Sequence, residues 1–157
     1  MDIEIRNPWH PDDAKHYTTD RMRNDFLIQD LFIPDKVKLV YSHVDRIIVG
    51  GVCPSEKVLT LEAGHELGVD YFLERRELGV INIGGPGTVI LDGEEYDLSY
   101  KDGLYAGMGI KEVSFKSDDP ANPAKFYLNS APAHHTYPTL KITMEMANKR
   151  PLGSVEG

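Results

Sequence analysis

The pattern of apolar positions along the chain predicts a series of short β-strands. From Leu27 onward, apolar and β-branched residues come in short runs that are divided by turn residues, among them Pro34 and Pro54. We expect strands within residues 27–33, 37–44, 45–52, 57–63, 87–98, 111–117, 124–130 and 140–147. Asp92 and Gly93 lie between two apolar runs, which is typical of a two-residue hairpin turn with positive φ.

Helix is expected only near the two ends of the chain. Pro11 is followed by two aspartates, which predicts a first helical turn because proline suits the first helical position and acids suit the positive end of the helix dipole. A second helical segment is expected to begin at Thr19 or Asp20 and to run toward Phe26. A further turn of helix is expected within residues 143–149.

Length and composition favour one all-β domain. The chain has 157 residues, of which 41% are hydrophobic, so it is long enough to bury a core of its own. Its 14 glycines and 10 prolines are spread along the chain, as in all-β proteins with many turns. We therefore expect a β-barrel at residues 27–142, a helical arm at 1–26 and a linker at 143–157.

Charge and cysteine content narrow the partners and the compartment. The formal net charge of -8 argues against a nucleic-acid partner, because binding phosphates needs a dense Lys/Arg surface. No apolar run approaches the roughly 20 residues that cross a bilayer, so no membrane partner is expected. Cys53 is the only cysteine, and the N-terminal sequence lacks the features of a signal peptide. A cytoplasmic location is expected.

The segment 71–107 has the layout of a metal-binding β-barrel without its metal ligands. In the double-stranded β-helix proteins called cupins, a first motif places two histidines on one strand face, where they share a metal with a following glutamate. Glu77 and Gly84 fit the second part of that motif. The two histidine positions are filled by Asp70 and Phe72 or, at the shorter spacing, by Tyr71 and Leu73.

The second cupin motif also keeps its spacing but lacks its histidine. Its positions correspond to Lys101, Gly107, Gly109 and Glu112, with Glu112 at the histidine position. A lone Glu77 with a distant Glu112 makes a poor site for zinc or iron. The sequence therefore predicts a cupin-like jelly-roll barrel with a short N-terminal helical segment and no metal of its own.

Three segments of the chain, 40–51, 71–88 and 123–138, resemble segments of one enzyme family. They occur in the same order and with similar spacing as in that family. The likeness is to the amino-terminal half of the 4-deoxy-L-threo-5-hexosulose-uronate ketol-isomerases, also called 5-keto-4-deoxyuronate isomerases. It implies a bacterial pectin-degradation enzyme that is usually a homohexamer. The implied reaction converts 5-dehydro-4-deoxy-D-glucuronate to 3-deoxy-D-glycero-2,5-hexodiulosonate by moving a proton between adjacent carbons through an enediol.

The resemblance also implies that the full-length enzyme has two cupin-like halves with different roles. The zinc of the full-length family belongs to its carboxy-terminal half, so none is expected on this chain. One hypothesis is that the chain is the non-metal half of such an isomerase and supplies scaffold, subunit contacts and part of the pocket wall. The alternative is a stand-alone metal-free cupin that binds an acidic sugar or a partner protein. A reading frame that continues past Gly157 into His-x-His-x4-Glu would favour the first.

The small acidic sugar carries a carboxylate, whose binding calls for guanidinium groups or backbone donors. The candidates are Arg46, Arg75 and Arg76. On a strand, Arg75 and Arg76 point to opposite faces, so at most one of them faces the barrel. Glu77 is either a pocket carboxylate or a structural residue, paired with Arg75 or Arg46 or in contact with solvent.

Other residues with reactive side chains are better explained by structural roles. His43 is expected to be hydrogen-bonded and half-buried in a strand, and His134 with His135 to lie in a polar loop or an interface. Cys53 is expected to be a small buried apolar residue. Residues 84–87 lack the spacing of a phosphate loop and predict a tight turn.

Apolar residues at both ends of the chain predict association with another copy or domain. They are Trp9 and Phe26 near the start, and Tyr127, Tyr137 and Leu140 near the end. A homo-oligomer is therefore expected, in agreement with the hexamers that the resemblance implies.

Overall fold

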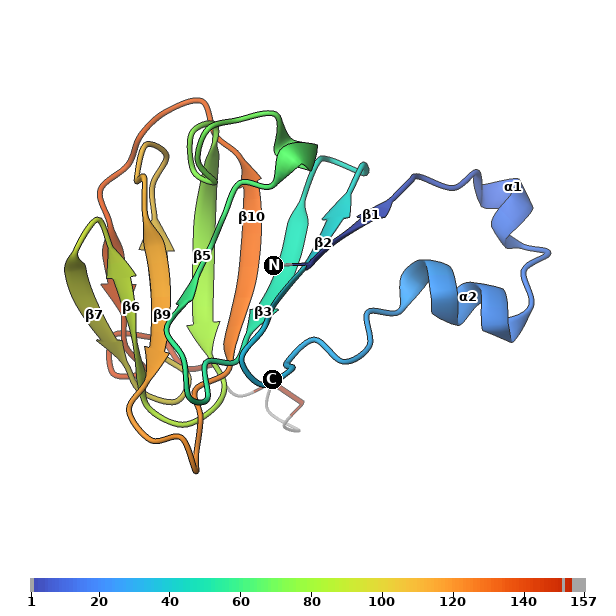
Figure 1. The fold of residues 1–157 in the computed structure, drawn as a ribbon. Helices are drawn as coiled ribbons and strands as arrows, with labels where there is room; N and C mark the ends of the chain where they lie inside the picture. Colours follow the sequence, from blue (N-terminus) through green and yellow to red (C-terminus); the bar gives the residue numbers. More distant parts are fainter. Residues whose placement is uncertain (1, 151, 154–157) are drawn as a thin grey trace.

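The computed structural model describes residues 2–150 and 152–153, which form two β-sheets packed face to face with a helical arm at one side (Figure 1). The larger sheet has the order β1-β2-β3-β10-β5-β8-β11 and the smaller sheet the order β4-β9-β6-β7. The strands are β1 (Asp2–Arg6), β2 (Val37–Ser42), β3 (Ile48–Val52), β4 (Leu59–Thr60), β5 (Arg76–Asn82), β6 (Gly87–Leu91), β7 (Glu94–Leu98), β8 (Gly103–Ala106), β9 (Val113–Ser117), β10 (Phe126–Pro132) and β11 (Leu140–Ile142).

Strands β3 to β10 have the topology of a jelly roll. The chain crosses from one sheet to the other at every step except the β6–β7 hairpin, and every pair among these eight strands is antiparallel. At the hairpin tip, Asp92 and Gly93 have φ values of 48° and 88°, as the sequence predicts. The cupin-like all-β fold is confirmed, and Glu77 lies on the central strand β5.

The space between the two sheets is filled by apolar side chains. Along β5, Leu78 and Val80 are buried while Ile81 is exposed, which is the alternation of a strand with one face on a core. The largest fully buried side chains include Phe72, Phe115 and Phe126. The rings of Phe115 and Phe126 lie 5.3 Å apart between centroids, so the centre of the barrel is packed.

The N-terminal arm differs from its prediction because it begins with a strand. Strand β1 pairs in parallel with β2 at the edge of the larger sheet, a contact with a distant segment that the local pattern does not reveal. The two predicted helices are present as α1 (Pro11–Ala14) and α2 (Thr19–Phe26), and Figure 1 shows both standing away from the barrel. Neither helix is long and apolar enough to cross a membrane, nor is any other in the part of the chain that the structure describes.

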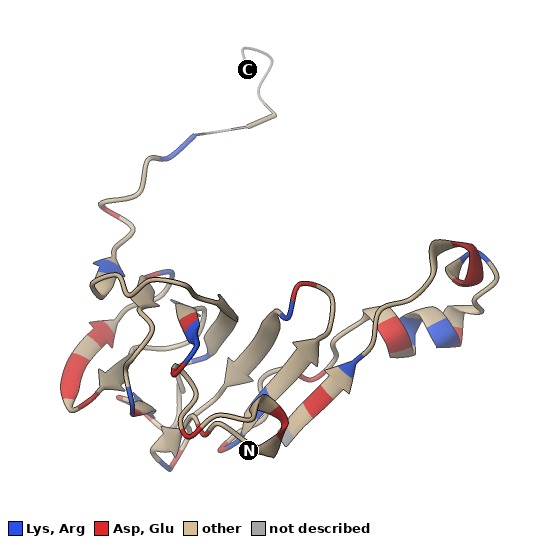
Figure 2. Cartoon of the chain, turned by 90° about the horizontal axis from the view of Figure 1, so that it is seen from above, with Lys and Arg blue, Asp and Glu red and all other residues tan. Residues whose placement is uncertain are grey.

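Two further predictions of local structure were wrong, and one helical turn was not predicted. Residues 27–33 are not a strand, because their backbone lies against Gly51, where a Cβ atom would come within 2.3 Å of the Leu31 carbonyl oxygen. Residues 143–149 form a turn and no helix, and they lead away from the barrel (Figure 2). The unpredicted element is a 3-10 helix, η1 (His65–Leu67), which precedes β5.

Candidate functional site: an arginine pocket at one end of the barrel

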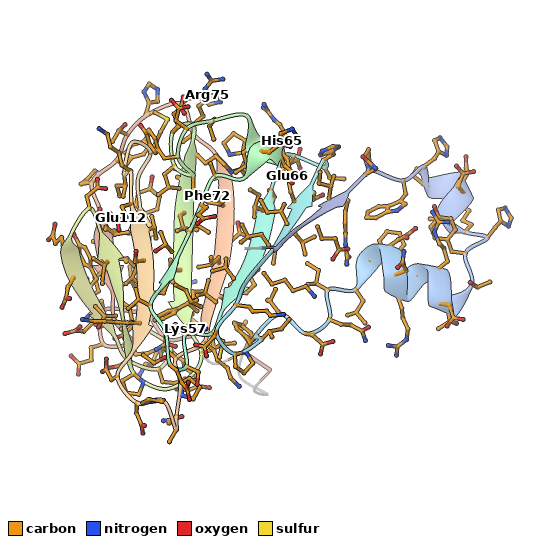
Figure 3. All side chains as sticks on the ribbon, viewed as in Figure 1. Lys57, His65, Glu66, Phe72, Arg75 and Glu112 are labelled. Atoms are coloured by element: carbon orange, nitrogen blue, oxygen red, sulfur yellow. The ribbon has the colours of Figure 1, made fainter. Side chains whose placement is uncertain are left out.

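The three arginines suggested by the sequence come together around one pocket. The pocket has a volume of about 180 Å³, and we call it the arginine pocket. It is lined by Tyr41, Arg46, Leu67, Val69, Arg75, Arg76 and Pro132. Figure 3 shows Arg75 at the end of the barrel near His65 of η1, away from Lys57 at the opposite end. Four separate segments of the chain therefore build the site.

Strand geometry sends the two adjacent arginines in different directions. Arg76 is the first residue of β5 and is buried, whereas Arg75 precedes the strand and is exposed. The expectation that only one of them faces the barrel is therefore confirmed. Arg46 lies in the loop between β2 and β3, is exposed, and has a φ of 54°.

Arg76 is held by hydrogen bonds to neutral groups. Its Nε donates to the Ser130 hydroxyl at 3.1 Å, and its Nη2 donates to the carbonyl oxygens of Ser130 at 2.9 Å and of Arg46 at 2.5 Å. The guanidinium lies over the ring of Tyr41, 5.6 Å from its centroid. These contacts hold the end of β5 to β10 and to the loop between β2 and β3.

Two of the three arginines of the pocket, Arg46 and Arg76, form no salt bridge among the described residues. Arg76 is only 7% exposed, and within residues 2–150 no acidic side chain forms a salt bridge with Arg76 or Arg46. Arg75 lies 3.7 Å from the carboxylate of Glu74, an exposed contact that contributes little. Burial lowers the pKa of Arg76, and the charge of Arg46 lowers it further. The arrangement can bind a small anion.

Glu77 does not belong to this pocket. It lies on the opposite face of β5 from Arg76, where its carboxylate accepts a hydrogen bond of 2.7 Å from the hydroxyl of Tyr105. The predicted pairing with Arg75 or Arg46 is not formed: among the described residues Arg75 contacts Glu74, and the carboxylate of Glu77 is bound by Tyr105 instead. Burial and the bond to Glu77 raise the pKa of Tyr105 to about 12.

The positions that correspond to cupin metal ligands do not fit zinc. Residues 70–73 form turns before β5, so they do not alternate on a strand face as the motif supposes. Phe72 and Leu73 are both buried in the core, and Glu112 is exposed. Within the described residues, no group of three His, Cys, Asp or Glu side chains could hold a metal ion. At either spacing, one of the two histidine positions holds a buried carbon side chain, Phe72 or Leu73, which cannot bind a metal.

The remaining candidates have structural surroundings. His43 is exposed beyond the end of β2, so the prediction of a half-buried strand histidine was wrong; its ring lies 5.2 Å from that of Tyr41. His134 and His135 are exposed in a loop, as predicted. Cys53 is buried, and burial raises the pKa of its thiol.

The glycine run at residues 84–87 is a tight turn between β5 and β6, as predicted. A Cβ atom at Gly85 would come within 1.9 Å of the Asn122 carbonyl oxygen, so this position has no room for a side chain. The buried amide of Asn82 donates to the carbonyl oxygens of Gly85 and Leu98, which ties the turn to the end of β7.

Sequence reasoning missed the residues that complete the arginine pocket. Tyr41 on β2 and Leu67 of the unpredicted η1 line the pocket, and Ser130 on β10 holds Arg76 in place. The one available signal was Ser130 at an inward position of an otherwise apolar strand, because a buried hydroxyl needs a hydrogen-bond partner.

Comparison with known proteins decides the family. Residues 27–156 match the sequence pattern of the KduI/IolB family. The chain belongs to the KduI/IolB family. A protein named 4-deoxy-L-threo-5-hexosulose-uronate ketol-isomerase from Lachnoclostridium phytofermentans is 57% identical over 155 residues, which cover 99% of this chain and 56% of that protein. One of the same name from Lachnospira eligens is 59% identical over 159 residues, covering 99% of this chain and 57% of that protein.

The chain spans a little over half the length of these curated relatives. Among solved structures, a cupin protein from Bacteroides fragilis aligns with 67% of this chain and 79% of its own, at 16% identity and a TM-score of 0.43.

Proposed function

We propose that this chain is the non-metal half of a ketol-isomerase that acts on 4-deoxy-L-threo-5-hexosulose-uronate. The observation that carries the proposal is the match of 57% and 59% identity, over 99% of the chain, to proteins of that name. The acidic sugar fits a chain whose candidate site presents three guanidinium groups and no competing salt bridge to Arg46 or Arg76 among the described residues.

The reaction itself is assigned to the part of the longer protein that follows this half. A zinc ion bound there would supply Lewis-acid chemistry for moving a proton between adjacent carbons of the sugar. The buried Phe72 and Leu73 at cupin ligand positions cannot bind a metal, and the exposed Glu112 lies apart from Glu77, whose carboxylate is bound by Tyr105, so the contribution of this chain is scaffold and substrate binding. The buried Cys53, which has no disulfide partner, fits the cytoplasmic location that belongs to the same proposal.

A homo-oligomer, with six subunits as in the resembling family, is part of the proposal, and one surface of the barrel supports it. The outer face of the larger sheet has a groove of about 310 Å³ that we call the outer groove. Its lining includes Gly79, Ile81, Gly103, Tyr105, Tyr127 and Ile142. Ile81 and Ile142 are more than two-fifths exposed. A Cβ atom at Gly79 would meet nothing closer than 3.7 Å, so these glycines leave the groove open without being required by packing within the chain.

The assembly is tested by filling the outer groove. Gly79→Leu projects a side chain into open space, so the barrel is expected to keep its melting temperature while the oligomer measured by sedimentation dissociates. Glu112→Leu, which adds a leucine at an exposed position outside the groove, is the control. An oligomer that Gly79→Leu leaves intact would show that another surface forms it.

The isomerase proposal is tested on the polypeptide encoded by the reading frame that contains this chain. Incubation with 5-dehydro-4-deoxy-D-glucuronate should give 3-deoxy-D-glycero-2,5-hexodiulosonate, followed by NMR. Elemental analysis of residues 1–157 after dialysis should find no stoichiometric zinc, because the donor set is missing. A complete reading frame that lacks isomerase activity would instead support a stand-alone binding module.

A further inference from the structure

We propose that the arginine pocket binds the 2-oxo-carboxylate end of the acidic sugar and leaves the rest of the sugar outside the barrel. The inference rests on the proposed function only for the identity of the sugar. The site lies at one end of the jelly roll and is separate from the packed barrel interior, where cupin ligand positions are filled by Phe72 and Leu73.

The first argument is the charge of Arg76. Its guanidinium is more than nine-tenths buried, and its hydrogen bonds are made by Nε and Nη2, with neutral oxygens as acceptors. Within the described residues, Nη1 donates no hydrogen bond to protein, although no polar side-chain atom is both fully buried and unpartnered. Nη1 of this pocket-lining arginine therefore remains available to a ligand. A buried cation without a counter-charge is costly, and a bound anion would relieve that cost.

The second argument is the arrangement of the other two arginines. Arg46 and Arg75 come from different loops, and both line the pocket together with Arg76. Guanidinium groups bind carboxylates through paired, charge-assisted hydrogen bonds. Arg46 and Arg75 are exposed and can adjust to a ligand, whereas Arg76 is fixed by Ser130. A fixed donor flanked by two adjustable donors suits a carboxylate with an adjacent oxygen.

The third argument is the size and the chemistry of the walls. A volume of about 180 Å³ is below the ~300–1,000 Å³ of pockets that enclose whole ligands, so it accommodates one end of a six-carbon sugar. The remaining lining includes Leu67, Val69 and Pro132, which offer carbon surface and no side-chain donors. Such walls favour carbons without hydroxyl groups next to the carboxylate.

This chemistry matches one end of the substrate named for the relatives. In 4-deoxy-L-threo-5-hexosulose-uronate, the carboxylate is followed by a ketone at carbon 5 and a methylene at carbon 4, so that end has the structure of a 2-oxo acid. The hydroxylated carbons and the aldehyde that isomerises lie at the other end. The arginine pocket would thus position the sugar without contacting its reacting atoms.

The probes for the test are 2-oxobutyrate, glucuronate, inorganic phosphate and glucose, each added to the chain at constant ionic strength. We expect 2-oxobutyrate to raise the melting temperature and to shift NMR signals of residues around the pocket. Glucuronate should bind at least about fivefold more weakly because its hydroxyl groups meet apolar walls, and glucose should not bind. Equal binding of phosphate and 2-oxobutyrate would overturn the assignment to a 2-oxo acid.

Variants separate this site from other cationic surface. Arg46→Gln and Arg75→Gln alter exposed side chains that the fold does not need, and each should weaken 2-oxobutyrate binding about tenfold or more. Arg23→Gln, which removes an exposed charge from α2, is the matched control and should bind like the parent. Binding that Arg46→Gln and Arg75→Gln both leave unchanged would overturn the proposal. The assay needs no turnover, so its failure is distinguishable from failure of the isomerase proposal.

Discussion

The barrel and the helical arm are held in place by different forces. The barrel buries an apolar cluster between its sheets, including the three fully buried phenylalanines. In α1 and α2, by contrast, the one buried residue is Asp25. The arm is held by polar contacts, such as those from Arg6 to the carbonyl oxygens of Asp25 and Leu27. Met22 and Phe26 remain almost half exposed.

This difference indicates which region of the chain can stay folded without the other. Burial of apolar surface is the main stabilising term in folding, whereas isolated helices as short as eight residues are marginal in water. The barrel therefore has its own source of stability, and the arm depends on the few bonds at its base or on surfaces that cover it. The following predictions test this contrast, in order of decreasing effect.

The largest effect is expected for Phe115→Ala in the barrel. Phe115 is fully buried against Phe126, so its truncation removes apolar contacts and leaves a cavity. The free energy of unfolding should fall by about 3–5 kcal/mol, measured by chemical denaturation. Tyr100→Ala, at an exposed position, is the control and should cost far less. A loss below about 1 kcal/mol would mean that the barrel is not the stable part.

The stability of the barrel should depend on pH through Asp35. Its carboxylate accepts hydrogen bonds from the backbone of Ser55, Glu56 and Lys57, and these bonds, chiefly that of Glu56, hold its pKa below the ordinary value. A lowered pKa contributes stability above about pH 4, and that stability is lost as the pH falls through the folded-state pKa. Asp35→Asn should therefore lower the melting temperature at neutral pH and reduce the acid sensitivity.

The matching substitution in the arm is Asp25→Asn. Hydrogen bonding to Arg21 lowers the pKa of Asp25, so its stabilisation has the same sign and is also lost in acid. Because this carboxylate lies in the arm, the melting temperature of the barrel should not change. An equal drop for Asp25→Asn and Asp35→Asn would show that arm and barrel unfold as one unit.

Tyr105 provides a probe of the outer face at high pH. Its pKa of about 12 is raised above that of an unfolded tyrosine, so its contribution to stability is present below about pH 10 and is lost between pH 10 and 12. The pKa of Tyr96 is raised as well, chiefly by burial, so absorbance titration should show late-ionising tyrosine signal of which the part near pH 12 disappears in Tyr105→Phe. Glu77→Gln should bring this ionisation to lower pH, because the neighbouring negative charge is removed.

Phe26→Ser, like Asp25→Asn, is expected to leave the stability of the barrel almost unchanged. The single tryptophan, Trp9, lies 4.4 Å from the ring of Phe26, so its fluorescence reports on the arm. We expect the fluorescence of Trp9 to change while the free energy of unfolding of the barrel changes by less than about 0.5 kcal/mol. A larger loss would contradict the independence of the two regions.

The sequence by itself determined the elements whose signals are local. Alternation of apolar residues predicted most of the strands, Asp92 with Gly93 predicted the hairpin, and Pro11 with Thr19 marked the helix starts. It also determined that Arg75 and Arg76 point apart, since that follows from strand geometry alone.

The tertiary structure decided which distant segments meet. The pairing of β1 with β2, the path of residues 27–33 over Gly51 and the joining of Arg46 to Arg76 all depend on contacts between segments that are far apart in the chain. Local patterns carry no information about such contacts, because they arise only when the sheets close around the core. For the same reason, the sequence offered Arg75 or Arg46 as the partner of Glu77, whereas the pairing of β5 with β8 brings the Tyr105 hydroxyl to it.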